Sequence, residues 1–156
     1  MIILRDCLQT MPTYAVNKRA RFDYEILDTT EAGLVLSGVE VKSIRTGSIK
    51  LLGAFVTFHN NTALLTNLHI PKYAKASTIQ SYNPDRSRKL LLKKKEIDKL
   101  RGKSQEQGLT IVPLSLYTKG PLIKLEIGVA RGLKKYDKRD KLKKRDIKRD
   151  MERERK

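Results

Sequence analysis

The sequence predicts a small, mainly β fold: a closed or nearly closed antiparallel barrel with two or three short flanking helices and a basic C-terminal tail. Three observations predict this fold class. The chain has 156 residues, which suits one domain of ordinary size. An apolar share of 39% is enough to build a core. Several short segments of apolar and β-branched residues follow one another at close spacing, as strands do in small barrels.

We expect residues 1–13 to form a loose leader and residues 14–130 to form the folded domain. In the leader, Asp6 interrupts the apolar run that a signal peptide needs. No stretch approaches the ~18 uninterrupted apolar residues of a membrane span, so we expect a soluble protein with no membrane partner. The single cysteine, Cys7, excludes an internal disulfide and suits a reducing compartment. The sequence therefore predicts a cytoplasmic protein.

The first part of the domain is expected to be extended, with one helix. Residues 22–26 alternate apolar and acidic side chains, which predicts a half-buried strand. The next segment, DTTEAG, predicts a turn whose glycine supplies a positive φ, before LVLSG continues extended structure. In VEVKSIRTG, residues 39–47, apolar residues three apart predict a short helix ended by its glycine, with Lys42 and Arg45 pointing outward.

The middle of the chain predicts a hairpin and a long connection. GAFVTFHNNTALLTNLHI reads as two strands around Asn60 and Asn61, residue types that tolerate a left-handed turn conformation. A polar connection, PKYAKASTIQSYNPDRSR, follows and is expected to run across the surface. Long ordered loops are often functional, which makes this connection a segment of interest.

The last part of the domain predicts one helix and two strands. After the short apolar run KLLL, residues 93–108 favour a helix with Ile97 and Leu100 inward and a glycine at its end. Two strands follow, joined by a turn at residues 118–121. In the second strand, Leu122, Lys124 and Glu126 share one face, while the alternate residues are apolar. Pro113 predicts a bulge or an edge position in the first strand.

The side chains needed for common catalytic and metal sites are scarce. Two histidines, His59 and His69, lie inside the predicted hairpin without ligands at recognisable spacing, so they are interpreted as satisfied strand histidines. Neither a nucleophile elbow nor a phosphate-binding loop occurs. Glu31 and Glu40 are candidates for paired catalytic carboxylates, but their spacing does not support that role. We therefore expect no catalytic residues, no metal, no cofactor and no small-molecule substrate.

Basic residues dominate the charge of the chain and predict a polyanionic partner. There are 34 Lys and Arg against 17 Asp and Glu, a formal net charge of +17. They concentrate in NKRAR, KSIR, RSRKLLLKKK and the C-terminal segment. One such run is more often a solvated face than a site, but four on one small chain favour nucleic acid. Because the chain lacks tryptophan and an aromatic-rich motif, recognition of folded RNA by shape and backbone is favoured over base stacking.

Residues 131–156 form a separate basic tail. They hold 14 Lys and Arg against 6 Asp and Glu, a net charge of +8. Their composition favours a helix, supported by acid–base pairs at i, i+4, but the apolar residues form no broad stripe. We expect the tail to be disordered alone and helical on an RNA surface. A merely solubilising tail is the alternative from charge alone.

Six strings of the chain resemble one family, the SsrA-binding proteins or small protein B of bacterial trans-translation. These are NKRARFDYEI, EAGLVLSGVEVKSIRTG, NPDRSRKLLL, GLTIVPLSLY, KLEIGVARG and DKRD, and they keep the family's order over about residues 14–140. The resemblance implies a barrel related to the oligonucleotide-binding fold and a tail that is unstructured until it meets the ribosome.

The resemblance also implies a function, the rescue of stalled ribosomes. The protein would bind the tRNA-like domain of transfer-messenger RNA, stabilise its association with the ribosome, and stand as a monomer where an anticodon stem would be. Its tail would lie in the empty mRNA channel, against ribosomal RNA near the decoding centre. A 26-residue helix reaches about 39 Å, which is long enough to probe such a channel.

Matching the family's motifs residue by residue gives the candidate site. The surface for transfer-messenger RNA would comprise Asn17, Lys18, Arg19, Arg21, Glu31, Ala32, Gly33, Lys42, Arg45, Lys89, Leu91 and Lys124. The ribosome-binding tail element would comprise Gly132, Lys134, Tyr136, Asp137, Lys138 and Arg139. The chain departs from the frequent family pattern at Leu133, where lysine is common, and at Tyr136, where many members have histidine; the departure puts a charged imidazole role in doubt.

Several alternatives stay open at this stage. A carboxylate repels phosphate, so Glu31 would accept from a base or a 2′-hydroxyl, or orient a basic side chain; otherwise it is a turn residue that satisfies backbone donors. Leu91 is expected to be partly core. For the whole chain, the runner-up function is a generic RNA-binding barrel of the translation machinery, and a third class is an RNA-modifying enzyme.

Overall fold

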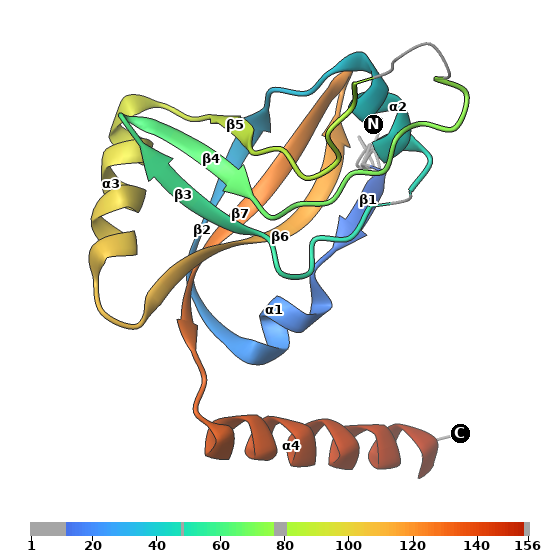
Figure 1. The fold of residues 1–156 in the computed structure, drawn as a ribbon. Helices are drawn as coiled ribbons and strands as arrows, with labels where there is room; N and C mark the ends of the chain where they lie inside the picture. Colours follow the sequence, from blue (N-terminus) through green and yellow to red (C-terminus); the bar gives the residue numbers. More distant parts are fainter. Residues whose placement is uncertain (1–11, 48, 77–80, 155–156) are drawn as a thin grey trace, which may run out of the picture.

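Seven strands form one antiparallel sheet in the spatial order β1-β6-β7-β2-β5-β4-β3 (Figure 1). The computed structural model describes residues 12–47, 49–76 and 81–154. Along the chain, the elements are β1 Thr13–Val16, α1 Lys18–Asp23, β2 Tyr24–Leu34, α2 Gly38–Arg45, β3 Phe55–His59, β4 Thr62–Thr66, β5 Arg88–Leu91, α3 Lys94–Gln105, β6 Leu109–Lys119, β7 Leu122–Gly132 and α4 Lys135–Glu154. The mainly β, antiparallel class predicted from the sequence is confirmed.

The sheet is strongly curved but does not close, so the prediction of a closed barrel is wrong. Within the described residues, β1 and β3 are the two edge strands, and no backbone ladder joins β3 to the opposite side. β3 does lie against β6. Part of the edge of β6 is already occupied, because β1 pairs with Ser115–Tyr117. In addition, Asn17 donates from its backbone N–H to the carbonyl of Leu114 and from its side-chain amide to that of Pro113. Side-chain packing rather than hydrogen bonding therefore fills the gap.

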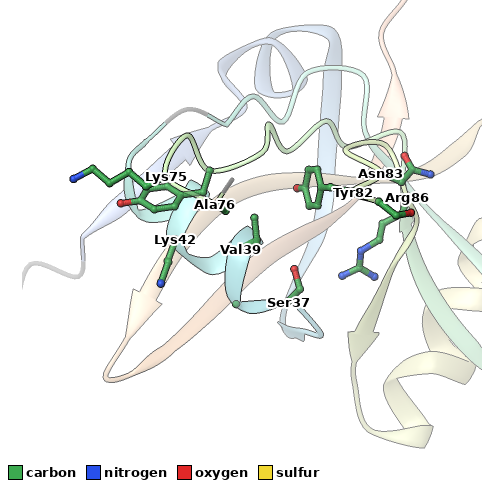
Figure 2. Close-up of a pocket in the computed structure, with 11 residues that line it drawn as sticks. Ser37, Val39, Lys42, Lys75, Ala76, Tyr82, Asn83 and Arg86 are labelled. Carbon is green, nitrogen blue, oxygen red and sulfur yellow. The ribbon is translucent and has the colours of Figure 1, made fainter. Parts of the chain in front are cut away.

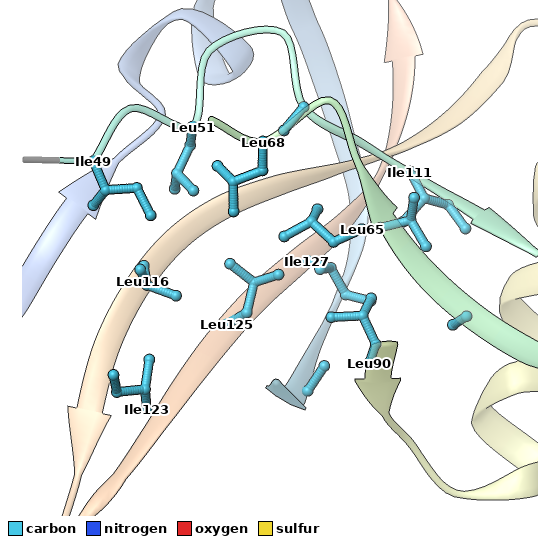
Figure 3. Close-up of a cluster of buried hydrophobic side chains, with 14 of the residues drawn as sticks. Ile49, Leu51, Leu65, Leu68, Leu90, Ile111, Leu116, Ile123, Leu125 and Ile127 are labelled. Carbon is cyan, nitrogen blue, oxygen red and sulfur yellow. The ribbon is translucent and has the colours of Figure 1, made fainter. Parts of the chain in front are cut away.

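The main hydrophobic core lies on the inner, concave face of the sheet (Figure 3). Leu65, Leu125 and Ile127 are fully buried there. The helices α2 and α3 contribute Ile44 and Leu100, which are also buried. Burying one such aliphatic side chain stabilises a fold by about 1.5–3 kcal/mol, so this face holds the domain together.

A second, smaller cluster lies on the outer face, where α1 packs against the sheet. Ala20 of α1 is buried with Val112, Leu114 and Ala130. Gly128 makes this close packing possible, because an added Cβ would lie 2.9 Å from Cδ1 of Leu114. In this way α1 covers one half of the outer face of β6, β7 and β2, and the described residues leave side chains such as Glu31 and Leu91 exposed on the other half.

Local predictions are confirmed where turn or capping residues mark them. The β3–β4 hairpin turns at Asn60 and Asn61, both with positive φ. The predicted short helix is α2, which a capping box starts at Ser37, and its Lys42 and Arg45 are exposed. The helix α3 and the β6–β7 hairpin also match, and the pairing register of β6 shifts after Pro113 as expected for a bulge.

Two predictions in the first part of the domain are wrong. The strand expected from residue 22 begins at Tyr24, because residues 18–23 form α1. The segment DTTEAG is the middle of the long strand β2 rather than a turn, and Gly33 has no positive φ. The reason is the sheet itself: residues 28–33 pair continuously with β7, which outweighs the local turn preference of aspartate, threonine and glycine.

The two ends of the chain differ from the domain between them. Residues 1–11 of the predicted leader lie outside the described residues, while Thr13 begins β1. At the other end the tail contains the helix α4. It lies below the sheet in the view of Figure 1 and contacts the domain at α1. No helix in the described part of the chain is long and apolar enough to cross a membrane.

Candidate nucleic-acid interface

The uncovered half of the outer sheet face carries two rows of side chains. Backbone pairing aligns one row across β6, β7, β2 and β5: Tyr117, Lys124, Gly33 and Leu91. A second row, beside it on β6, β7 and β2, holds Ser115, Glu126 and Glu31. Because side chains alternate between the faces of a strand, both rows point away from the core. These seven residues are called the outer-face site below.

Glu31 is the centre of the outer-face site. The hydroxyl of Tyr117 donates a hydrogen bond of 2.5 Å to its Oε2. The ammonium of Lys119 lies 3.4 Å from the same oxygen, and that of Lys124 lies 3.9 Å from Oε1. The bond from Tyr117, helped by the two lysines and opposed by burial, holds the pKa of Glu31 below its ordinary value. The carboxylate is ionised at neutral pH, and because the side chain is 38% exposed it can accept a further hydrogen bond.

The other groups of the outer-face site are also paired with one another. Burial and the bond to Glu31 raise the pKa of Tyr117 to about 12, so its hydroxyl stays protonated and keeps donating. Ser115 donates from Oγ to Oε2 of Glu126 at 2.9 Å, and the guanidinium of Arg21 lies 3.6 Å from that oxygen. The face therefore carries two neighbouring carboxylates, Glu31 and Glu126, and each has a cation beside it. Such a pattern suits recognition of one RNA shape better than unspecific attraction.

Gly33 and Leu91 form the apolar end of the outer-face site. They are backbone neighbours, and a Cβ on Gly33 would lie 3.1 Å from Cβ of Leu91. Leu91 is 55% exposed, so more than half of this candidate contact residue is accessible to a partner. A surface pocket of about 510 Å³ opens here and also contacts Lys93 and Glu96. An exposed leucine beside a lysine offers one contact to a base or ribose and one to a phosphate.

Two of the candidate contact residues point into the protein. Ala32 is 1% exposed and belongs to the core. Asn17 is 7% exposed and caps α1: its Oδ1 accepts from the backbone N–H of Ala20, and its Nδ2 donates to the carbonyls of Leu51 and Pro113. Its side-chain amide thus ties α1 to the sheet, so an effect of Asn17 on RNA binding would pass through the position of α1.

The basic run Arg86–Lys95 is divided between the interior and the surface. Arg88 is fully buried and donates from Nε to Oε1 of Glu40 at 2.9 Å, and Arg86 donates to both oxygens of the same carboxylate. Burial would raise the pKa of Glu40, but hydrogen bonds from Arg86, Ser37 and Arg88 keep it below its ordinary value. Lys89 is exposed on β5. Of Arg86, Arg88 and Lys89, Lys89 is therefore the one whose charge is not bound to Glu40.

The remaining basic candidates lie on two helices. On α1, Lys18 and Arg19 are exposed, and Arg19 pairs with Asp23 at 3.1 Å. On α2, Lys42 and Arg45 are exposed on the far side from the buried Ile44. The structure brings Glu31, Gly33, Leu91 and Lys124 together in one site, adds Arg21 through Glu126, and leaves these helical residues around it.

The candidate tail element lies at the junction of β7 and α4. Gly132 is the last residue of β7, and Lys134, Tyr136, Asp137 and Arg139 are exposed. Tyr136 is 72% exposed. Lys138 differs, because its ammonium contacts Oδ1 of Asp23 at 3.0 Å, and this bond is the main cause of the lowered pKa of Asp23.

The histidines and the second candidate carboxylate have structural partners. His59 ends β3, but His69 lies beyond β4 and bonds Asp85 at 2.8 Å, so the interpretation of His69 as a strand histidine is wrong. The strand β4 ends at Thr66, and the turn at Asn67 that follows places His69 outside the sheet. Glu40 binds arginines and Glu31 binds a tyrosine and lysines, so the two carboxylates are not paired with each other. No group of metal-ligating side chains occurs among residues with described placement.

Sequence reasoning missed three members of the outer-face site, Ser115, Tyr117 and Glu126, and the neighbouring Lys119. A usable signal existed, because the short turn between β6 and β7 fixes the register of a hairpin. Counting back from the turn places Tyr117 opposite Lys124 and Ser115 opposite Glu126. The pairing of β7 with β2, which brings Glu31 beside them, has no such local signal.

Comparison with known proteins identifies the family. A model of the family described as SmpB protein matches residues 14–156. The chain belongs to the SmpB family. SmpB relatives include the SsrA-binding protein of Oleidesulfovibrio alaskensis, 49% identical over 140 residues with 90% of each chain covered. That of Streptomyces coelicolor is 53% identical over 139 residues, covering 89% of this chain and 87% of the relative.

A solved structure supports the same SmpB assignment. It is described as "tmRNA-SmpB: a journey to the center of the bacterial ribosome", and the similar chain in it is 46% identical, with a TM-score of 0.66. The match covers 77% of this chain and 84% of that one. Fold and sequence therefore agree over most of the domain.

Proposed function

We propose that this chain binds transfer-messenger RNA and acts with it on the ribosome in trans-translation. The observation that carries the proposal is the SmpB match over residues 14–156, together with relatives named SsrA-binding protein at about half identity. The strong positive charge of the chain is in keeping with two RNA partners.

The outer-face site is the proposed surface for the tRNA-like domain. Lys119 and Lys124 would neutralise phosphates, and the exposed Leu91 would contact a ribose or base. Glu31 would accept from a base N–H or a 2′-hydroxyl, because Tyr117 and the lysines hold its carboxylate ionised and in place. A 2′-hydroxyl is the group that distinguishes RNA from DNA, so Glu31 would contribute specificity rather than bulk attraction.

The tail is the proposed contact to the ribosome. With the domain standing where an anticodon stem would be, Gly132, Lys134 and residues 136–139 would lie at the decoding centre. The helix α4 has 20 residues and a length of about 30 Å, so it would extend into an mRNA channel that an intact message would fill. Its exposed cations suit ribosomal RNA phosphates. That the tail is disordered before it meets the ribosome stays a prediction.

Several finer features belong to the same proposal. A topology related to the oligonucleotide-binding fold would explain why one sheet face binds RNA. The chain would act as an adaptor without catalysis, as a monomer in the cytoplasm. A generic RNA-binding protein of the translation machinery remains the competing function, and the two differ in which RNA they select.

The RNA that co-purifies with the full chain tests the proposal. The chain would be captured from bacterial cells that lack their own SmpB, washed at physiological salt, and its RNA sequenced. We expect transfer-messenger RNA to be enriched over every tRNA by at least about tenfold, and a Glu31→Ala, Lys124→Ala variant to lose most of that enrichment. Equal recovery of all tRNAs would favour the generic function.

A further inference from the structure

A groove between α2 and the connection that follows β4 lies outside the outer-face site, although Lys42 in its wall is among the RNA-binding residues that the family resemblance implies. It has a volume of about 840 Å³, within the range of sites for small ligands. Its walls are Val39 and Lys42 of α2 and, from residues 71–86, Tyr73, Lys75, Tyr82 and Arg86. Figure 2 shows the two lysines at one end of the groove, Tyr82 above Val39, and Arg86 at the other end.

The charge of the groove selects an anionic occupant. Lys42, Lys75 and Arg86 line it, and none of the described lining residues is acidic. The carboxylate that Arg86 contacts, Glu40, is fully buried and is neutralised by two arginines. Lys42 and Lys75 are exposed, and their ammonium groups make no ion pair among the described residues. Both are therefore available to a phosphate.

The aromatic side chains of the groove favour an occupant that also contains a flat ring. Tyr73 and Tyr82 are half-buried in the groove wall. The hydroxyl of Tyr82 donates to the carbonyl of Ile70 at 2.8 Å, which holds this ring in the groove wall. Tyrosine faces beside cations are the common means by which proteins hold single-stranded bases, with stacking on the ring and phosphates on the lysines.

We propose that this groove binds an unpaired nucleotide of transfer-messenger RNA, with its base against the tyrosines and its phosphates at Lys42 and Lys75. The inference rests on the proposed function, because a short stretch of chain joins the outer-face site to the groove. Beyond the end of β2 at Leu34 the chain reaches the N-cap of α2 at Ser37, and the backbone N–H of Val35 on this link donates to the carbonyl of Lys89. An RNA on the outer-face site would reach the groove along this link, which extends recognition from RNA shape to one base.

Affinity measurements on the full chain separate the groove from the outer-face site. Binding of a fluorescent tRNA-like-domain transcript would be followed by anisotropy for Lys42→Ala, Lys75→Ala together and for Tyr73→Leu. We expect each to weaken binding by about fivefold to tenfold, and the lysine variant to reduce the salt slope by about 1.5. The control Lys103→Ala removes a lysine near the end of α3, outside the basic runs and outside the groove lining, and should change affinity by less than about twofold.

Photo-crosslinking identifies the occupant. The transcript would carry 4-thiouridine, and crosslinked peptides would be mapped by mass spectrometry in the free complex and on ribosomes. We expect a crosslink between an unpaired nucleotide and a peptide that contains Tyr73 or Tyr82. Unchanged affinity of both groove variants, with Glu31→Ala still weakening binding, would overturn the groove and leave the proposed function standing. Crosslinks of this segment to ribosomal RNA alone would overturn the assigned partner, and no effect of either set of variants would overturn both proposals.

Discussion

The outer-face site and the helix α4 both expose many charges, yet they are built in opposite ways. In the outer-face site, each carboxylate is held by neighbouring side chains on a paired sheet, as Glu31 is by Tyr117 and Glu126 is by Ser115. The helix α4 touches the domain mainly through Lys138 at Asp23 and Arg145 over the ring of Phe22. A fixed pattern of paired groups can select one RNA shape, whereas a loosely attached cationic helix can follow any phosphate-lined channel.

Removal of the tail gives the largest expected effect and would separate the two regions. A chain that ends at Gly132 keeps the whole sheet but loses α4. We expect tagging on stalled ribosomes to fall by at least about a hundredfold, while affinity for transfer-messenger RNA changes by less than about threefold. In vitro tagging and anisotropy on the same preparation measure both. A tenfold loss of RNA affinity would show that the tail is part of the first interface.

Arg88 and Lys89 are sequence neighbours, but Arg88 is buried and Lys89 is exposed. Replacing each in turn tests whether the charge at that position serves stability or binding. Arg88→Met leaves Glu40 in the interior with Arg86 as its remaining ionic partner, so we expect a loss of about 3–5 kcal/mol in the free energy of unfolding. Lys89→Met, at the exposed neighbouring position, should cost less than about 0.5 kcal/mol. Urea unfolding measures both. Equal stability of the two variants would contradict the division of the run.

The central carboxylate should act on affinity rather than on stability. Glu31→Ala removes one acceptor and leaves the core intact, so we expect RNA affinity to fall by about tenfold with an unchanged melting temperature. Glu25→Ala, an exposed carboxylate on the same strand, is the matched control. A fall in melting temperature that accompanies the loss of affinity would favour a structural role for Glu31.

The smallest effect is expected at the contact between the domain and α4. Because the pKa of Asp23 is depressed in the folded chain, its bond to Lys138 is present above the ordinary value of 3.8 and is lost as pH falls through the lower folded value. Asp23→Asn removes the charge that binds Lys138, as protonation of Asp23 does in the unaltered chain. We therefore expect faster amide exchange in α4 for this variant at pH 7. Amide hydrogen exchange in α4 measures this, and unchanged protection in Asp23→Asn would show that other contacts hold the helix.

The parts of the fold that could be predicted from sequence are those with local signals. Asn60 and Asn61 mark the β3–β4 turn, Ser37 and Glu40 cap α2, and Gly108 ends the segment of α3 with a positive φ. The parts that could not be predicted depend on distant partners. The helix α1 has six residues, and its capping Asn17 is fixed by the carbonyl of Pro113. Likewise, nothing near Arg88 in the sequence shows that it will be buried on Glu40.

The sequence predicted several residues of the candidate site, but it did not predict which side chains contact one another there. The family resemblance indicated Glu31, Gly33, Leu91 and Lys124, and the structure places them together. It could not show that Tyr117, 86 residues after Glu31, holds the carboxylate, since that contact depends on the β2–β7 and β6–β7 pairings together. The same limit applies to the groove beside α2, whose walls come together only when residues 73–76 and 81–86 pack near that helix.

Competition binding tests the central claim most directly, that the outer-face site selects transfer-messenger RNA. The full chain, bound to a labelled tRNA-like-domain transcript at physiological salt, would be challenged with unlabelled transcript or with an unrelated tRNA. We predict that the tRNA competes at least about a hundredfold less well, and that Glu31→Ala reduces this ratio. Equal competition by the two RNAs, unchanged in the variant, would contradict the claim.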